Sequence, residues 1–288
     1  MGLPIFRFVG LLFAICIVCS ATVGVCGELP HSFIKAYKPA LQKLISAYTN
    51  VTVEGTISHQ LPQAHKSREQ SFAYWAAGTS SRLDVTTTAS QGMGGKLGST
   101  EVLLSTPGAS LSASWEPDSP AFDTARELSD GDARSSIETT SRLFQPYALD
   151  ERENILEHLK RDSVRIVSYR EVALEGRDVV KISYNDTLFE AGRKAEWKAW
   201  LILSPSEGWA LRQYSRTTGE GDRQVTFQGS LEYGGVSEDG VPLLQRIDCW
   251  KQQGRSQTYF ERDVISISRF VLGTPSQYYF RAMGLDVR

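Results

Sequence analysis

The sequence has few cysteines, few histidines and no run of like charge. Cysteine occurs four times in 288 residues, and Cys16, Cys19 and Cys26 all lie near the N-terminus. If that segment is removed, Cys249 alone remains, which excludes a disulfide framework and requires a buried apolar core. The formal net charge is −2. We therefore predict no nucleic-acid partner, because such proteins need a basic surface that neutralises phosphates.

The chain also lacks the residue patterns of common enzymes and phosphate sites. No serine lies in a G-x-S-x-G elbow, and the glycine-rich segment "SQGMGGKLGS" lacks the hydroxyl and the upstream glycine of a phosphate loop. Glu232 and Glu238 could be read as a glycosidase pair, but carboxylates beside a turn are usually solvated. We predict that the protein is not an enzyme and has no catalytic residues.

Metal and cofactor motifs are absent from the sequence as well. None of the histidines belongs to an HExxH pair, and the turn between His59 and His65 is polar, so we expect surface positions for them. Cys249 has no base near it in the sequence and is interpreted as a small buried residue of a strand. The sequence thus predicts neither a metal site nor a cofactor. The histidines are His31, His59, His65 and His158.

The N-terminus has the order of parts found in an export signal. Arg7 precedes the apolar run "FVGLLFAICIVC" from Phe8 to Cys19, and small residues follow up to Gly27. The run is too short for a helix that spans a bilayer. We predict a signal peptide over residues 1–27 and an exported protein of the periplasm or cell envelope. The alternative is a lipid anchor at Cys26, although the β-branched Val25 fits poorly before an acylated cysteine.

Two amphipathic segments predict helices. In "HSFIKAYKPALQKLISAYTN", apolar residues recur at steps of three and four, and because proline is disfavoured inside helices we expect the helix from near Pro39 to Tyr48. The segment "DERENILEHLKR", residues 150–161, predicts a second helix that begins with a capping pair, Asp150 and Glu153. Its expected buried stripe is Ile155, Leu156 and Leu159.

Most of the remaining chain alternates between apolar and polar residues. Short runs such as "VTVEGTISHQ" and "VTFQGSLEY" are separated by turn formers, which is typical of consecutive antiparallel strands. Residues 117–135 are polar and rich in turn formers, so we place a seam and a helical insert around 117–161. The pattern predicts an α+β fold with a large curved antiparallel sheet, formed by residues 28–288 as a single domain.

The segment "WKAWLILSP" is apolar on both faces. Trp197, Leu201 and Leu203 point one way, whereas Trp200 and Ile202 point the other way, so both faces need cover. Such a face can line an interior cavity. The tentative cavity residues are the aromatic residues that we expect to face inward, namely Tyr74, Trp75, Trp197, Trp200 and Phe227.

The order of helix, meander, helical insert and second meander resembles the LolA/LolB-like superfamily of periplasmic lipoprotein carriers. The resemblance rests on "LQKLISAYTNVTVEGTIS", "FAYWAAGTSSRLDVT", "VVKISYND", "WLILSPSEGWALRQYS" and "LEYGGVSEDGVPLLQRI". It implies an incomplete β-barrel with helices on its concave side and an apolar cavity for acyl chains. The family's arginine before a proline turn is missing, since Ala76 and Ala77 stand in its place, so no arginine role is carried over.

Two functions from different classes follow from these patterns. The first is a non-enzymatic carrier or sensor that binds a lipid or another hydrophobic ligand in the cavity of a half-barrel. Its partners would be a lipid, an acyl chain or an envelope lipoprotein, and it would be peripheral to a membrane at most. The alternative is a structural or protein-interaction module of the cell envelope, with a filled core and no small ligand. The abundance of inward aromatic residues favours the carrier.

Overall fold

The computed structural model describes residues 27–107, 109–118, 124–127, 144–148, 154–190, 193–254 and 259–280. The predicted signal peptide, apart from Gly27, lies outside these ranges. The helices are α1 (His31–Tyr48), α3 (Ile155–His158) and the 3₁₀ helices η1 (Pro62–Ala64), η2 (Pro205–Glu207), η3 (Gly221–Arg223) and η4 (Gln277–Phe280). The strands are β1 (Asn50–Leu61), β2 (Lys66–Ala77), β3 (Ser80–Gln91), β4 (Thr100–Thr106), β5 (Ala109–Trp115), β6 (Thr124–Glu127), β7 (Val164–Leu174), β8 (Arg177–Glu190), β9 (Arg193–Ser204), β10 (Ala210–Thr218), β11 (Val225–Val236), β12 (Pro242–Gln253) and β13 (Glu261–Leu272).

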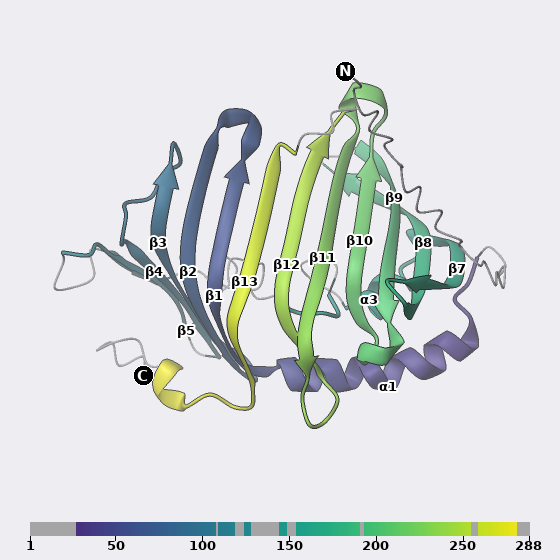
Figure 1. The fold of residues 1–288 in the computed structure, drawn as a ribbon, viewed down its shortest axis with the longest axis horizontal. Coiled ribbons are helices and arrows are strands. Elements are labelled where there is room, and N and C mark those ends of the chain that lie inside the picture. Colours follow the sequence, from purple (N-terminus) through teal and green to yellow (C-terminus); the bar gives the residue numbers. More distant parts are fainter. Residues whose placement is uncertain are drawn as a thin grey trace, which may run out of the picture.

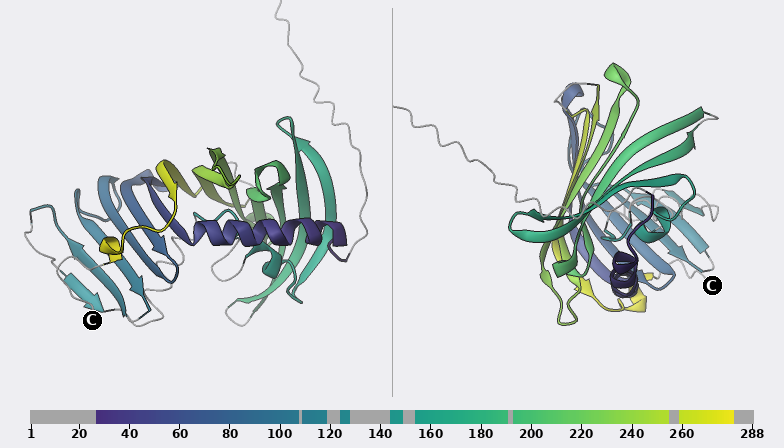
Figure 2. Two further views of the ribbon diagram at one scale, coloured as in Figure 1. Left: turned by 90° about the horizontal axis from the view of Figure 1, so that it is seen from below. Right: turned by 90° about the vertical axis from the view of Figure 1, so that its right-hand side faces the viewer.

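The strands of the described ranges form one antiparallel sheet of thirteen strands (Figure 1). Its order, β6-β5-β4-β3-β2-β1-β13-β12-β11-β10-β9-β8-β7, is two meanders joined where the first strand pairs with the last. In this order β6 and β7 are the two edges, so the sheet is open. Figure 2 shows that the sheet is strongly curved. The predicted large, curved and open antiparallel sheet is therefore confirmed.

Helix α1 is longer than the sequence predicts. It begins at His31 and carries Pro39 in its interior, so the expected start near Pro39 is wrong. Proline inside a helix removes one hydrogen bond and costs about 3 kcal/mol. The apolar face continues unbroken through the proline, because Phe33 and Tyr37 before it are as buried as Leu41 after it. Burial of two large aromatic residues outweighs the local cost, at about 1.5–3 kcal/mol per side chain.

The buried face of α1 packs against several strands of the sheet. Phe33 contacts Tyr169 of β7 and Trp209 at ring distances of 5.6 Å and 5.5 Å. At the other end of the helix, the Tyr48 ring lies 5.2 Å from Phe270 of β13, and its hydroxyl donates to the Pro242 carbonyl at 2.7 Å. The helix therefore runs across the lower ends of the strands in Figure 1, from β7 to β13.

No helix among the described residues is long and apolar enough to cross a membrane.

The second helix is shorter than predicted. The predicted capping pair Asp150 and Glu153 lies outside the described residues, and the observed cap is Asn154, whose side chain accepts from the Glu157 amide at 3.0 Å. Helix α3 ends at His158, because the amides of Lys160 and Arg161 bond three residues back in successive turns. The predicted buried stripe of Ile155, Leu156 and Leu159 is confirmed.

The predicted seam falls largely outside the described ranges. Within it, the structure describes residues 117–118 and the short edge strand β6, which pairs with β5. The seam was expected to consist of turns, so β6 is an element that the polar composition did not indicate. A four-residue edge strand is common at the end of a sheet, where pairing on one side is enough.

The two faces of the sheet can be named from the packing. We call the face that packs against α1 the inner face; it carries Val51 and Val53 of β1 and Leu201 and Leu203 of β9. The opposite face is the outer face. Near the middle of β1, a Cβ atom at Gly55 would lie 2.1 Å from the Ser266 carbonyl oxygen of β13. Only glycine allows this close approach, which accompanies the shift of register between the two strands.

Candidate functional site

A row of alternating aromatic and charged side chains crosses five strands on the inner face. It consists of Trp197, Arg216, Phe227, Lys251 and Glu261, and we call it the aromatic–cation row. The register places the last four directly opposite one another on β10, β11, β12 and β13. The Arg216 guanidinium lies 4.9 Å from the Trp197 ring, and the Lys251 ammonium lies 5.0 Å from the Phe227 ring. Cations at such distances are attracted by the ring faces.

The row lies at the end of the strands that is farthest from α1. From Val53, which packs near α1, six residues of strand lead along β1 to His59, or about 20 Å at about 3.3 Å per residue. Asp263 and Cys249 lie at the same level as His59 by register, and Lys251 and Glu261, whose side chains are 3.8 Å apart, lie two residues farther from α1. The inner face is thus divided into an apolar half under α1 and a half that carries charged groups.

Two polar groups of the row have no hydrogen-bond partner. The Trp197 indole N–H and the Arg216 Nε are both buried and unpaired within the part of the chain that the structure describes. Trp197 itself is 7 % exposed. A buried donor without a partner costs about 1–3 kcal/mol, and more when it is charged. The Arg216 guanidinium lies over the indole ring to which the Trp197 N–H belongs.

A polar cluster adjoins the row on the inner face. His59 of β1, Asp263 of β13, Cys249 of β12 and Tyr214 of β10 follow one another across the sheet. His59 Nδ1 lies 2.5 Å from an Asp263 carboxylate oxygen, and the Tyr214 hydroxyl lies 3.4 Å from the Cys249 sulfur. The Tyr214 ring crosses above Gly229 of β11, where any larger residue would collide with it.

The electrostatics of the cluster keep its thiol protonated. Burial raises the pKa of Cys249 to about 11, and the Asp263 charge adds to the effect, while the Tyr214 hydroxyl opposes it. Burial also raises the pKa of Tyr214 well above its usual value. Cys249 is therefore not an activated nucleophile. Cys249 lies in a strand, β12, as predicted, but its residue is partly exposed and not fully buried.

The structure places the five predicted cavity residues in different surroundings. Trp197 and Phe227 are in contact, with ring centroids 5.8 Å apart, and both belong to the row. Tyr74 lies on the inner face of β2, where its ring is 5.6 Å from Phe144. That these residues line a ligand cavity stays a prediction.

The other two predicted residues lie on the outer face. Trp75 follows Tyr74 in β2 and therefore points the opposite way, where it stacks on Tyr279 at 4.8 Å. Trp200 of β9 also points outward, and the Lys181 ammonium lies 4.6 Å from its ring. The two apolar faces predicted for β9 are confirmed, since Ile202 on the outer face is 5 % exposed and Leu201 on the inner face is fully buried.

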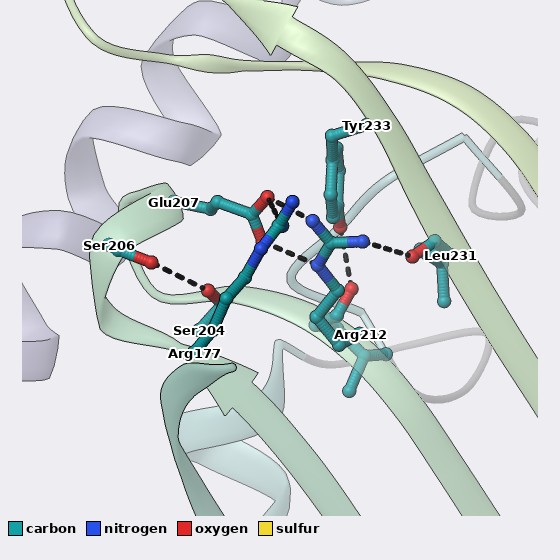
Figure 3. A network of polar contacts seen from close by, with 8 residues as sticks. Arg177, Ser204, Ser206, Glu207, Arg212, Leu231 and Tyr233 are labelled. Atoms are coloured by element: carbon teal, nitrogen blue, oxygen red, sulfur yellow. Dashed lines mark hydrogen bonds and ion pairs between the residues drawn. The ribbon is translucent and has the colours of Figure 1, made fainter. Parts of the chain in front are cut away.

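A second group of charges surrounds Glu207 at the end of η2. Its carboxylate accepts hydrogen bonds from Arg212, in a two-pronged pair, and from Arg177 at 2.6 Å (Figure 3). The Arg212 guanidinium also lies 5.0 Å from the Tyr233 ring. Burial would raise the pKa of the Glu207 carboxyl, but the hydrogen bonds and charges of the two arginines outweigh it and lower that pKa. Glu207 is ionised and serves to hold the arginines in place.

A small polar pocket lies beside this group. Its volume is about 240 Å³, and it lies between the β7–β8 turn and strands β10 and β11. Several of the residues that line this pocket are charged, whereas the family resemblance implies an apolar cavity. Both of its arginines are already paired with Glu207. The lining residues are Leu174, Glu175, Arg177, Val179, Arg212, Gln213, Ser230, Leu231 and Glu232.

Two of the four histidines are not at the surface, contrary to the prediction. His158 is 1 % exposed, and its Nε2 lies 3.7 Å from the buried carboxylate of Asp186. His59 is partly buried and paired with Asp263. His31 and His65 are exposed as expected. Neither pair could be seen in the sequence, because the acidic partners are far away along the chain, 204 residues in the case of His59.

Two of the five residues of the row were predicted from the sequence, and three were not. Trp197 and Phe227 were selected as large aromatic residues in strands. Arg216, Lys251 and Glu261 were not, because an isolated charged residue in a strand normally faces solvent. The missing signal is the cross-strand register, which decides that these charges lie beside aromatic rings and which a single sequence does not contain.

The chain is distantly similar to solved protein structures. No family model matches it, and neither does any curated protein. Among solved structures it is similar to a DUF1329 family protein from Desulfovibrio piger, with 13 % identity, a TM-score of 0.44 and coverage of 86 % of this chain and 96 % of that one. It is also similar to an outer membrane lipoprotein-sorting protein domain from Vibrio parahaemolyticus, with 11 % identity, a TM-score of 0.45 and coverage of 85 % and 97 %.

Both matches cover most of this chain. They are likenesses of fold, and with identities of 13 % and 11 % and TM-scores below 0.5 they identify no ligand, partner or activity for this chain. The function must therefore be inferred from the residues of the inner face.

Proposed function

We propose that the protein is an exported, non-enzymatic carrier or sensor that binds an amphiphile, namely a lipid or another ligand with an acyl chain and an acidic group, on the inner face of its sheet. The observation that carries this proposal is the aromatic–cation row, in which the Trp197 N–H and the Arg216 Nε are buried and have no partner among the described residues. An acidic head group would accept from both donors and lie near the Lys251 ammonium.

The apolar part of such a ligand would lie along the rings of the row. Trp197 and Phe227 form a continuous aromatic surface, and the Phe260 ring lies 4.7 Å from the Lys251 ammonium on the far side. Aromatic rings contribute large apolar areas, while their neighbours provide the polar contacts that orient a ligand. One charged end and one apolar surface match an amphiphile better than a purely apolar ligand.

The proposal includes the half-barrel arrangement that the family resemblance implies. In it, α1 and α3 lie on the concave side of the sheet, residues 28–288 form one domain, and the predicted cavity is open at the end away from α1. Its support is the packing of the buried face of α1 on inner-face residues of the sheet. In a sheet that curves around its helices, the uncovered half of the inner face is the natural place for a ligand.

A second candidate is a structural or protein-interaction module of the cell envelope with a filled core. The observation in its favour is the density of aromatic residues under α1, where Phe33 stacks on Tyr37 at 5.2 Å and Trp209 closes the group at 5.5 Å from Phe33. In this second candidate, that half of the inner face would be filled by side chains of the protein itself. The two candidates therefore differ in what occupies the half beyond α1.

Native mass spectrometry after mild extraction from the host membrane separates the candidates. A carrier retains lipid, and the delipidated protein takes up a fluorescent fatty acid. Loss of a charge-assisted hydrogen bond costs about 1.5–3 kcal/mol, so Arg216→Gln should weaken uptake about tenfold or more. The matched control is Lys181→Gln, which removes the cation beside Trp200 on the outer face and should leave uptake unchanged.

Two results would end the proposal. One is a wild-type protein that carries no lipid and takes up no probe, which would leave the interaction module. The other is equal binding by the wild type and Arg216→Gln, which would remove the row as the binding surface.

A further inference from the structure

We propose that His59, Glu261 and Asp263 form a binding site for a divalent first-row transition-metal ion, with zinc as the reference ion. The three side chains come from the two strands that join the meanders, β1 and β13, and they lie on the inner face. This inference is separate from the amphiphile proposed above, because it concerns a different kind of ligand and shares only Glu261 with the aromatic–cation row.

The donor atoms converge without any change of the backbone. One potential ligand atom from each of the three residues lies within 4.8 Å of the other two. His59 and Asp263 are direct partners in the ladder, and Glu261 lies two residues before Asp263 on the same face. Zinc lies about 2.0–2.2 Å from imidazole nitrogen and carboxylate oxygen, which sets neighbouring donors about 3.4 Å apart. Small side-chain rotations would bring the three atoms to that spacing.

The present contact between His59 and Asp263 is compatible with an ion. His59 Nδ1 and the Asp263 oxygen are 2.5 Å apart, so they would separate by about 1 Å to admit a metal. The second Asp263 oxygen could then accept other contacts. The side chains of His59 and Asp263 are 19 % and 37 % exposed, which leaves a path for an ion from solvent and an open coordination position for water. Sites on paired strands hold their ligands more firmly than sites on loops.

The charges around the three residues favour a cation. Two carboxylates face one ammonium, that of Lys251, at 3.8 Å from Glu261. Lys251 is in turn drawn towards the Phe227 and Phe260 rings. Arg68 stands opposite His59 on β2, but its side chain extends along the sheet to the Gly95 loop. A divalent ion at this place would be neutralised by the two carboxylates, and Lys251 and Arg68 are the cations that would compete with it.

The set of donors determines the class of ion. Calcium and magnesium prefer oxygen ligands throughout, whereas an imidazole with carboxylates suits zinc and its first-row neighbours. Cys249 is not included, because its sulfur is engaged by the Tyr214 hydroxyl. Three protein ligands with a remaining position for water correspond to an open metal site rather than a closed structural one.

Isothermal titration of the untagged, EDTA-treated protein with zinc chloride tests the proposal. We expect one ion per chain. The near-isosteric variants His59→Gln, Glu261→Gln and Asp263→Asn should each weaken binding by more than about tenfold, because even residues that merely support metal ligands contribute that much. The visible absorption of a cobalt(II) complex of the wild type gives a second measurement, which needs no variant to fold.

Two control variants come from the same region of the protein. Glu54→Gln removes a carboxylate that is paired with Arg269 at 2.8 Å on the same two strands but on the outer face. His65→Asn removes the exposed histidine of the turn after β1, and asparagine tolerates the positive φ of 52° there. Neither change should alter zinc binding.

Three results would overturn the inference. These are the absence of one-to-one zinc binding and of a cobalt(II) spectrum, an affinity that is equal in the wild type and all three ligand variants, and a loss of affinity in the controls as large as that in the ligand variants. Uptake of the fatty-acid probe should be the same with and without EDTA. A failure of the metal site is therefore distinguishable from a failure of the proposed function.

Discussion

Replacement of Gly229 by alanine should destabilise the protein through a single side chain, Tyr214. A Cβ atom at Gly229 would lie 2.3 Å from the nearest ring atom of Tyr214 and 2.7 Å from its hydroxyl. Ordinary contacts of this kind are about 3.5–4.0 Å. The Tyr214 ring must therefore shift by about 1 Å, although it lies over the sheet between Gly229 and the Cys249 sulfur.

The expected cost follows from two opposed effects. Overpacking of a well-packed site costs about 1–3 kcal/mol. Alanine in place of glycine inside a strand returns about 0.5–1 kcal/mol through the entropy of the unfolded chain. We therefore expect Gly229→Ala to lower the free energy of unfolding by about 1–2 kcal/mol, measured by urea denaturation.

A double-mutant cycle isolates the cause. In the background of Tyr214→Ala the obstacle is gone, so Gly229→Ala should be neutral or slightly stabilising there. The control is Gly234→Ala in the same strand, where the nearest atoms belong to the flexible Gln245 side chain at 3.3 Å. The reasoning is refuted if Gly229→Ala is harmless in the wild type, or if it costs the same in both backgrounds.

Three further outcomes can be measured by the same unfolding assay. Ile202→Asp should lower the free energy of unfolding by more than about 3 kcal/mol, because it buries an unpaired charge on the outer face of β9. Trp200→Asp, at a half-buried position, should lower it less. Equal stability of the wild type and Ile202→Asp would mean that this face is exposed. Pro39→Ala should raise the free energy of unfolding by about 1–3 kcal/mol, because it restores a hydrogen bond on the exposed side of α1, and a destabilised variant would contradict this. Because the pKa of Glu207 is lowered, its ionised carboxylate stabilises the fold at pH values above the ordinary carboxyl pKa of 4.5, and this contribution is lost as the pH falls through the lowered pKa. Glu207→Gln should remove that part of the pH dependence of the free energy of unfolding. An unchanged dependence at acidic pH would show that the contacts with Arg212 are not responsible.

The sheet could be predicted from the sequence because its signal is local. Alternation with period two marks each strand, and turn formers separate one strand from the next. The same alternation placed Leu201 and Leu203 on one face of β9 and Ile202 on the other, as the structure confirms. The start of α1 was misplaced because a local rule about proline competes with the burial of Phe33 and Tyr37, and that burial depends on the partner surface.

The polar part of the inner face could not be predicted because it is set by pairing between distant strands. His59 and Asp263 are 204 residues apart, and their contact follows from the pairing of the first strand with the last. Arg216, Phe227 and Lys251 are brought into one row by the register of three strands. A shift of one residue in either register would turn a member of the row to the outer face.

The two halves of the inner face should contribute differently to the stability of the fold. Helix α1 covers the half of the inner face that contains Val51, Val53 and Leu203, and there it belongs to one cluster of buried apolar side chains. The other half presents charged groups beside rings, and its unpaired donors at Trp197 and Arg216 are a local cost that the apolar half must offset. Changes that remove these donors should therefore leave the fold as stable as before, or more stable, while changes under α1 should unfold it. A protein whose inner face served only as core would show the opposite, with a stability cost for every change in the row.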